Sequence, residues 1–192
     1  MIDRTIGYAM CGSFCTFQES LRVLEQLTQQ FTQVIPILSE ASAGMDTRFG
    51  TAEEHLDTVT RLCGRRPWTS IQEVEPIGPK KLLDLLIVSP CTGNTLGKIA
   101  HGITDSAVTM AVKAHLRNQR PVLLAVSTND GLGASGGNIM ELLQRKHLFL
   151  VPFGQDDPVG KPASLKADFS KMGESAIAAL EGRQLQPVLV QR

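Results

Sequence analysis

Leu82-Leu-Asp-Leu-Leu-Ile-Val88 is the most continuous apolar run of the chain, and Ser89-Pro-Cys-Thr-Gly-Asn-Thr95 follows it directly. An almost unbroken apolar run of this length is typical of a parallel strand that helices cover on both faces. The polar residues after it lead into apolar spacing of helical period. We therefore expect a central strand that passes through a short polar loop into the N-terminus of a helix.

The same alternation of strand and helix extends over the whole chain. Further strands are expected at 4–10, 33–38, 121–126 and 147–151, and helices at 16–31, 51–63, 94–101, 105–117, 136–146 and 165–180. Pro36 predicts either a sheet edge or an irregular end for the second strand, because proline cannot donate to a ladder. The pattern predicts a single α/β domain over 1–192, a three-layer αβα Rossmann-like or flavodoxin-like fold with a mainly parallel central sheet.

Local signals complete this interpretation. Thr16 and Thr51, each followed three residues later by glutamate, predict capping boxes, and Asp105 is expected to cap the helix after it. The stretches 39–50 and 68–81 have no clear period, so a polar connection and an irregular segment are expected there.

Composition excludes several classes of protein. Among 192 residues, 19 basic and 19 acidic side chains cancel, so no net field attracts nucleic acid or an anionic membrane. The apolar runs are too short for a membrane helix, and the first residues do not resemble a signal peptide, which predicts a cytoplasmic protein. A net charge near zero favours association, so a homo-oligomer is expected. The four cysteines and four histidines lack metal-ligand spacing, so reduced thiols and no metal are expected.

Three polar loops follow predicted strands. They are Cys11–Thr16, Ser89–Thr95 and Ser127–Gly131. In parallel α/β sheets, ligands bind at the carboxyl ends of the strands, where loops lead into helix N-termini that suit phosphate. Each loop alone is also explained as an ordinary turn or cap, but together they predict one shared site.

Such a site offers hydroxyls, amides and helix N–H groups but few charges. These groups suit a flat, phosphorylated small molecule such as flavin mononucleotide (FMN). The residues expected to bind this cofactor are Gly12, Ser13, Phe14, Ser39, Ser89, Thr92, Asn94, Thr95, Ser127, Thr128 and Asn129.

Several motifs together carry a family resemblance. Gly12-Ser13, the run Ser89–Thr95 leading to Gly97-Lys98-x-Ala-x-Gly102-x-x-Asp105, and Ser127-Thr-Asn129 resemble the flavoprotein superfamily of flavin-containing cysteine decarboxylases. Within it, five further segments resemble the family of dipicolinate synthase B subunits over almost the whole chain: Asp46–Gly50, Pro76–Lys80, Arg117–Pro121, Pro152–Pro158 and Leu185–Pro187.

The resemblance implies oxidation of dihydrodipicolinate to dipicolinate during spore formation, in the cytoplasm of the mother cell. It implies an A subunit as partner, with NADP held by that partner. A non-catalytic flavin-fold partner of the oxidoreductase subunit is an alternative. A decarboxylase ranks last, because the superfamily's Pro-Ala-Met-Asn loop is replaced by Ser127-Thr-Asn-Asp130. His55, in the early region that holds the decarboxylases' catalytic histidine, is expected to face solvent and is not assigned.

A dicarboxylate substrate needs cationic partners, because an unpaired buried charge is costly. Arg48 and Lys98 are the substrate-binding candidates, although each is also explained as a solvated surface residue. Asn129 and Asp130 could orient a ligand or serve as acid and base, and Asp130 is equally suited to a turn. Cys11 and Cys91 are more simply explained as buried packing residues than as reactive thiols. No residue is assigned as catalytic.

Overall fold

The computed structural model describes residues 1–191. Its strands are β1 (Ile2–Met10), β2 (Phe31–Leu38), β3 (Leu85–Cys91), β4 (Val122–Thr128), β5 (Leu148–Leu150), β6 (Phe153–Gly154) and β7 (Leu165–Ala167). They form one sheet of order β2-β1-β3-β4-β7-β6, with β5 also paired to β4. Strands β1 to β5 pair in parallel, whereas β6 and β7 add an antiparallel extension. The predicted mainly parallel α/β sheet is confirmed.

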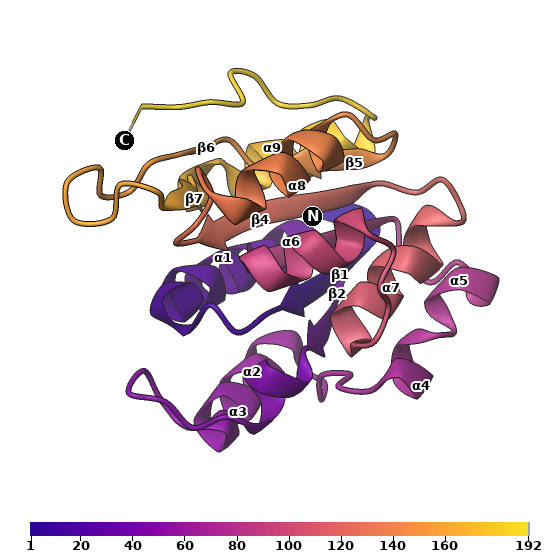
Figure 1. Cartoon of the computed structure of the whole chain (residues 1–192). Coiled ribbons are helices and arrows are strands. Elements are labelled where there is room, and N and C mark those ends of the chain that lie inside the picture. Colours follow the sequence, from indigo (N-terminus) through magenta and orange to yellow (C-terminus); the bar gives the residue numbers. More distant parts are fainter. Residues whose placement is uncertain (192) are drawn as a thin grey trace.

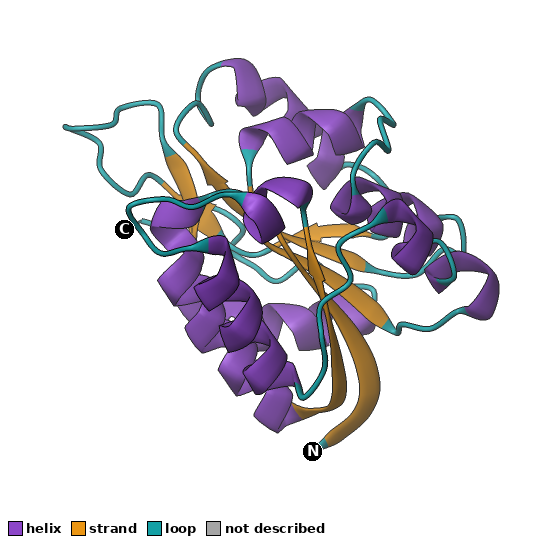
Figure 2. Cartoon of the chain, turned by 90° about the horizontal axis from the view of Figure 1, so that it is seen from below, coloured by secondary structure: helices purple, strands orange, loops and turns teal. Residues whose placement is uncertain are grey.

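Helices cover both faces of this sheet (Figures 1 and 2). They are α1 (Phe17–Gln30), α2 (Glu40–Gly44), α3 (Ala52–Cys63), α4 (Ile71–Val74), α5 (Ile77–Lys80), α6 (Gly93–Ala100), α7 (Ala107–Leu116), α8 (Ala134–Leu143) and α9 (Met172–Leu180). Short 3₁₀ turns at Phe14–Thr16 and Phe169–Lys171 precede α1 and α9. No helix within residues 1–191 is long and apolar enough to span a membrane.

Alternation along the strands divides the core into two layers. Leu86 and Val88 pack with α6, α7 and α8, whereas Leu85 and Ile87 pack with α1, α3 and α9. Successive side chains of a strand point to opposite faces, so a strand buried on both sides must be apolar throughout. This explains the continuous run that predicted β3, which lies between β1 and β4.

The structure corrects the start of the second loop. Strand β3 continues through Pro90 to Cys91, so the loop begins at Thr92. Ser89 is fully buried in the strand, where Tyr8 Oη donates to its hydroxyl at 3.0 Å. The polar side chain is tolerated there because a buried partner satisfies it.

Two predicted caps are wrong. Thr16 precedes α1 without capping it, because its hydroxyl donates back to Ser13 O at 2.9 Å within the 3₁₀ turn. Ser106, not Asp105, caps α7 and forms a capping box with Thr109. The predicted box of Thr51 and Glu54 is confirmed.

Three segment predictions also need correction. The polar connection contains the short helix α2, and the irregular segment contains α4 and α5. The last helix begins at Met172, because residues 165–167 form β7 against β4.

The edge position predicted from Pro36 is confirmed: β2 is the first strand of the sheet, although Trp68 N donates to Pro36 O on its outer side at 2.9 Å.

Candidate functional site

The three polar loops meet at the carboxyl edge of the sheet. Strand β4 continues through Ser127 to Thr128, so the third loop begins at Asn129 rather than at Ser127 as predicted. Ser13 of the first loop and Ser127 near the end of β4 share a hydrogen bond of 2.8 Å between their hydroxyls. Gly93 of the second loop packs against the end of β4 so closely that an added Cβ would lie 2.6 Å from Thr128 Oγ1. The loops therefore lie together at one edge of the sheet, but their residues divide between two cavities rather than lining the one pocket that the sequence predicted.

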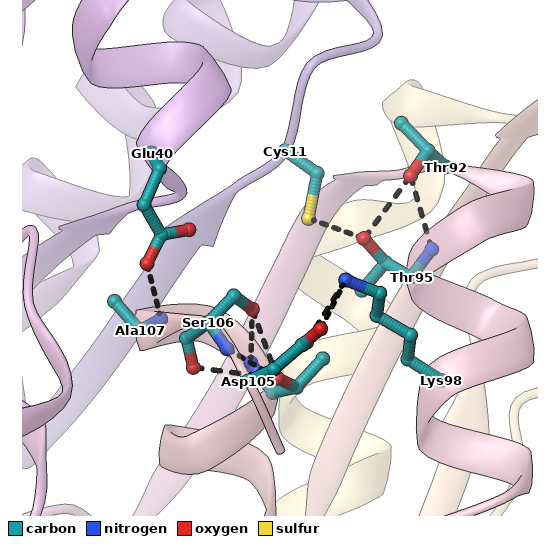
Figure 3. Close-up of polar contacts among 9 residues, drawn as sticks. Cys11, Glu40, Thr92, Thr95, Lys98, Asp105, Ser106 and Ala107 are labelled. Atoms are coloured by element: carbon teal, nitrogen blue, oxygen red, sulfur yellow. Dashed lines mark hydrogen bonds and ion pairs between the residues drawn. The ribbon is translucent and has the colours of Figure 1, made fainter. Parts of the chain in front are cut away.

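A cavity of about 400 Å³, which we call the main hollow, opens beside these loops. Its lining residues come from the ends of β1 and β2, from the N-terminal regions of α2 and α7, and from both the first and the last turn of α6: Cys11, Gly12, Ser39, Glu40, Ala41, Thr92, Asn94, Thr95, Lys98 and Ser106. Figure 3 shows part of this lining, with Lys98 and Asp105 directed toward each other. Six residues predicted to bind cofactor or substrate thus line one cavity: Gly12, Ser39, Thr92, Asn94, Thr95 and Lys98.

Hydrogen bonds within the protein already engage several hydroxyl groups of the main hollow. Thr92 caps α6 by accepting from Thr95 N at 3.2 Å and donates to Thr95 Oγ1 at 3.0 Å. Thr95 Oγ1 in turn donates to Cys11 Sγ at 3.2 Å (Figure 3). Ser39 caps α2 by accepting from Ser42 N. These hydroxyls fix the shape of the wall, and the exposed Asn94 amide makes no such bond.

Two charged side chains from different elements border the main hollow. Lys98 Nζ donates to both carboxylate oxygens of Asp105, at 2.8 and 2.9 Å. This hydrogen bonding to Lys98 holds the pKa of the Asp105 carboxyl below its usual range. Glu40 Oε1 accepts from Ala107 N at 3.2 Å, at the N-terminus of α7, where the helix dipole favours a negative charge. Figure 3 shows both contacts.

The donor set of the main hollow fits a phosphate group. The first N–H groups of α6, at Gly93 and Asn94, have no intrahelical acceptor, and the positive end of the helix dipole lies there. Asn94 and Lys98 add an amide and an ammonium group. A Cβ at Gly12 would already touch Ala41 Cβ and the Phe14 ring at 3.4 Å, so glycine leaves room at the wall. The Glu40 carboxylate opposes an anion, but its bond to α7 compensates part of its charge.

The remaining loop residues line a second cavity of about 60 Å³, the minor hollow. Ser13, Ser127, Thr128 and Asn129 lie there, together with Lys161 and other residues of the segment before β7. The structure thus places Asn94 in one hollow and Ser13 and Asn129 in the other, at the same edge of the sheet. The segment 155–164 has no periodic signal; its first part, Pro152–Pro158, was equally explained from the sequence as a lid, a subunit contact or a surface loop.

Asp130 is held as a carboxylate. Thr128 and Ser135 donate to Asp130 Oδ1, and these hydrogen bonds lower the pKa of its carboxyl. A carboxyl with a lowered pKa is a poor proton donor at neutral pH. The contacts identify Asp130 as the residue that ties the third loop to the start of α8.

Two predicted cofactor ligands have other surroundings. The Ser89 hydroxyl is enclosed with Tyr8 and Ser20 in the core, so it does not line the main hollow. Phe14 packs its ring 5.2 Å from the Phe17 ring, between centroids, on the side of the sheet where α1 lies. The edge of its ring lies 3.4 Å from the position that a Cβ on Gly12 would take.

Arg48 and His55 also differ from expectation. Arg48 is exposed and stacks on Phe49, with its guanidinium carbon 4.8 Å from the ring centroid, and does not line the main hollow. His55 does not face solvent: it is 3% exposed and packs against Phe17. The helical period alone could have indicated this, because Leu56 and Val59 continue the same apolar face.

The buried cysteines are unreactive by their environment. Burial raises the pKa of the Cys11 thiol to about 11 and that of Cys91 well above its ordinary value. A thiol rather than a thiolate is then present at neutral pH, which favours the packing role over a nucleophilic one. Within residues 1–191, no group of three or more His, Cys, Asp or Glu side chains could hold a metal ion.

Sequence reasoning missed Glu40, Ser106 and the partner of Lys98. The seven-residue spacing of Lys98 and Asp105 was visible, but their ion pair depends on how the chain turns between α6 and α7. Glu40 was hidden in a stretch without a recognisable period.

The parallel sheet and the phosphate-compatible main hollow at its carboxyl edge are consistent with a flavin-binding class of protein, and the comparison with known families agrees. The profile of the Flavoprotein family matches residues 2–142, and the chain belongs to this family. The fold agrees with that of the FMN-dependent cysteine decarboxylase SpaF, which has 20% sequence identity and a TM-score of 0.67 over 93% of this chain and 97% of that chain.

A narrower relationship follows from the whole chain. The dipicolinate synthase B subunit of Bacillus subtilis (strain 168) is 41% identical over 188 residues, 98% of this chain and 94% of that protein. The crystal structure of the dipicolinate synthase B subunit from Bacillus halodurans C matches with a TM-score of 0.91 and 39% identity, over 100% of this chain and 98% of that chain. Within the flavoproteins, this chain is therefore a member of the family of dipicolinate synthase B subunits.

Proposed function

We propose that this chain is the flavin-binding B subunit of a dipicolinate synthase. It acts with an A subunit in the oxidation of dihydrodipicolinate to dipicolinate, which removes two hydrogens and makes the ring aromatic. The observation that carries the proposal is the main hollow, whose amide, ammonium and helix N–H donors suit a phosphate. Similarity to known B subunits over nearly the full chain supports the reaction assigned to it.

In this proposal, the α6 N-terminus, Asn94 and Lys98 hold the FMN phosphate. Gly12 and Ser39 shape the wall beside it, and Asp105 positions the Lys98 ammonium group. When bound, the flavin ring would supply a two-electron acceptor. The residues of the minor hollow, Ser13, Thr128 and Asn129, would border the flavin on the side of the third loop.

The proposed function also includes a partner cofactor, a cellular location and an oligomeric state. NADP is bound by the A subunit and is the final acceptor of the two electrons, so this chain supports a reaction completed on its partner. The synthase acts in the cytoplasm of the mother cell of a sporulating bacterium. A homo-oligomer of this chain is expected, because a formal net charge of zero does not oppose association.

A second candidate function is a non-catalytic partner that keeps the flavin fold. The state of the reactive side chains favours it: the carboxyl pKa of Asp130 is lowered and the thiol pKa values of Cys11 and Cys91 are raised. None of these three groups is therefore poised to exchange a proton near neutral pH. A decarboxylase remains the weakest candidate.

Two measurements test these proposals. Titration of the purified chain with FMN, followed by flavin absorbance and fluorescence, should show saturable uptake. A mixture of the chain with its A subunit, dihydrodipicolinate and NADP should form aromatic product. Omitting each protein in turn shows which one is required. Product formation at an unchanged rate without this chain would contradict its catalytic role, and failure to take up FMN would leave the non-catalytic candidate.

A further inference from the structure

A groove separate from both hollows lies between α1 and α3. These helices pack side by side on one face of the sheet and enclose a cavity of about 560 Å³ with Phe49 and Gly50. The main hollow instead borders α6 and α7, which cover the other face. We call the cavity between α1 and α3 the helix groove.

The floor of the helix groove contains a buried polar atom without a partner. His55 is 3% exposed, and its Nε2 has no hydrogen-bond partner in the structure. Burial lowers the pKa of the His55 imidazole, so the ring is neutral at pH 7. A neutral imidazole can present Nε2 as donor or acceptor, depending on the tautomer. An unsatisfied buried nitrogen costs free energy, which a ligand atom placed against it would recover.

Gly50 covers this nitrogen. A Cβ on Gly50 would lie 3.2 Å from His55 Nε2 and 2.9 Å from Cε1, so no side chain fits between the turn and the ring. The covering backbone belongs to an exposed turn closed by hydrogen bonds between Thr47 and Gly50. A small outward movement of this turn would expose Nε2 to a ligand in the helix groove.

Two guanidinium groups line the walls. Arg22 comes from α1 and Arg61 from α3, and neither has an ion-pair partner within residues 1–191. Two carboxylates also border the helix groove. Glu54 is held in the capping box of α3 by accepting from Thr51 N at 2.8 Å, whereas Glu25 is exposed and has no partner for its carboxylate among the described residues. The helix groove thus carries two guanidinium groups and two carboxylates, of which Glu54 is engaged at a helix N-terminus and Glu25 is not.

The rest of the lining combines polar and apolar side chains. Gln18 and Thr58 lie there beside Leu21, Leu62 and Phe49. Phe17 packs against His55 at a centroid distance of 4.7 Å. Apolar side chains beside convergent polar groups are a feature of small-molecule sites. A flat ring with anionic substituents matches this combination better than an inorganic anion does.

We propose that the helix groove binds a ring dicarboxylate of the pyridine or dihydropyridine class, with Arg22 and Arg61 meeting its carboxylates and His55 meeting its ring nitrogen. The choice of the pyridine class depends on the proposed function, whereas the preference for a flat dicarboxylate comes from the groove itself. This site differs from the sequence prediction, which assigned the carboxylates to Arg48 and Lys98.

Calorimetric titration of the full chain with dipicolinate tests the proposal. Arg22→Gln and Arg61→Gln should each weaken binding about tenfold, and Glu25→Gln should strengthen it. Arg4→Gln is the matched control, because Arg4 carries the same charge but lies in β1, paired with Asp84. Loss of affinity in the control equal to that in the groove variants would overturn the site.

His55→Phe separates a ligand contact from a structural role. It keeps an aromatic ring against Phe17 but removes Nε2, so it should weaken dipicolinate binding about tenfold while leaving Tm unchanged or raised. Isophthalate has the same two carboxylates without the ring nitrogen, and its affinity should not respond to this variant. An unchanged dipicolinate affinity in His55→Phe, or an equal loss for both acids, would refute the nitrogen contact.

Activity distinguishes failure of this proposal from failure of the proposed function. If the reconstituted synthase forms product while dipicolinate affinity is unchanged in all four groove variants, the groove assignment is wrong and the proposed function stands. If dipicolinate binding follows the predicted pattern but no product forms with both subunits present, the groove assignment stands and the proposed function is wrong.

Discussion

Lys98 Nζ and the carboxylate of Asp105 form a two-contact ion pair at the border of the main hollow, at 2.8 and 2.9 Å. The pair joins α6 to the turn before α7, so the ammonium group has a defined position although its side chain is 26% exposed. A fixed cation loses less conformational entropy when a phosphate binds than a freely moving lysine does.

Lys98→Gln should therefore weaken FMN binding about tenfold, because it removes a charge-assisted bond to the phosphate. Riboflavin has the same ring system without the phosphate, and its affinity should change little. Fluorescence titration of both flavins measures the difference. An equal loss for riboflavin would show that the variant damages the hollow rather than the phosphate contact.

Tyr8→Phe should destabilise the fold by about 1 kcal/mol, because it removes the buried hydrogen bonds of the Tyr8 hydroxyl while Ser20 and Ser89 still bond to each other. Tyr8 is fully buried, and its Oη contacts Ser20 Oγ at 2.7 Å and Ser89 Oγ at 3.0 Å. Urea unfolding measures the free energy of unfolding. Thr32→Val is the control, because its exposed hydroxyl donates to Ile2 O at 3.1 Å, and it should change stability by less than about 0.5 kcal/mol. Similar losses in both variants would contradict this account.

Sequence reasoning succeeded where burial imposes a periodic pattern. The continuous apolar run of β3 and the position of Pro36 fixed the sheet centre and one edge, because both follow from how strands pair. It failed where a contact with distant chain decides the local structure. Ser89 looked like a loop residue, but Tyr8 and Ser20 satisfy it inside the sheet. Glu40 reaches α7 across 67 positions, which no local pattern reveals.

The candidate site shows the same limit. The loops that follow β1, β3 and β4 were predicted to converge, and they do, because parallel strands end at one edge. How they divide between two hollows depends on the segment 155–164 and on side-chain bonds such as that of Ser13 to Ser127. His55 was misplaced although the helical period indicated its burial, because Leu56 and Val59 continue the same apolar face toward α1.

Gly93→Ala should disrupt the junction of the second and third loops. An added Cβ would lie 2.5 Å from Ser135 Oγ and 2.6 Å from Thr128 Oγ1, closer than atoms tolerate. We expect a loss of about 1–3 kcal/mol in stability, typical of overpacking, and weaker FMN uptake. Gly97→Ala, one turn further along α6, meets only Asn138 Nδ2 at 3.4 Å and should be neutral or stabilising. Equal unfolding free energies for the two variants would contradict the close packing at Gly93.

Thiol labelling should separate the cysteines by burial. Cys15 is exposed and should react rapidly with a thiol reagent at mildly alkaline pH. Cys11 and Cys91 are buried, and burial raises their thiol pKa values, so they should react only after unfolding. Mass spectrometry of partly labelled protein identifies the sites. Rapid labelling of Cys11 in the folded chain would show that the main hollow exposes a reactive sulfur.

His115 should make the fold sensitive to acid. Burial lowers the pKa of its imidazole to about 4, from an ordinary value of 6.5, and the nearby Arg120 charge contributes to the decrease. Between pH 6.5 and about pH 4 the unfolded chain binds a proton at this residue and the folded chain does not, so stability falls as the pH decreases through this window. The accumulated loss of unfolding free energy from this group is roughly 3 kcal/mol.

His115→Leu should remove this part of the pH dependence and also the unpartnered Nε2 atom. Urea unfolding at about pH 4.5 and about pH 7.5 compares the two proteins across this window, and parallel stability losses in both would exclude His115 as the source.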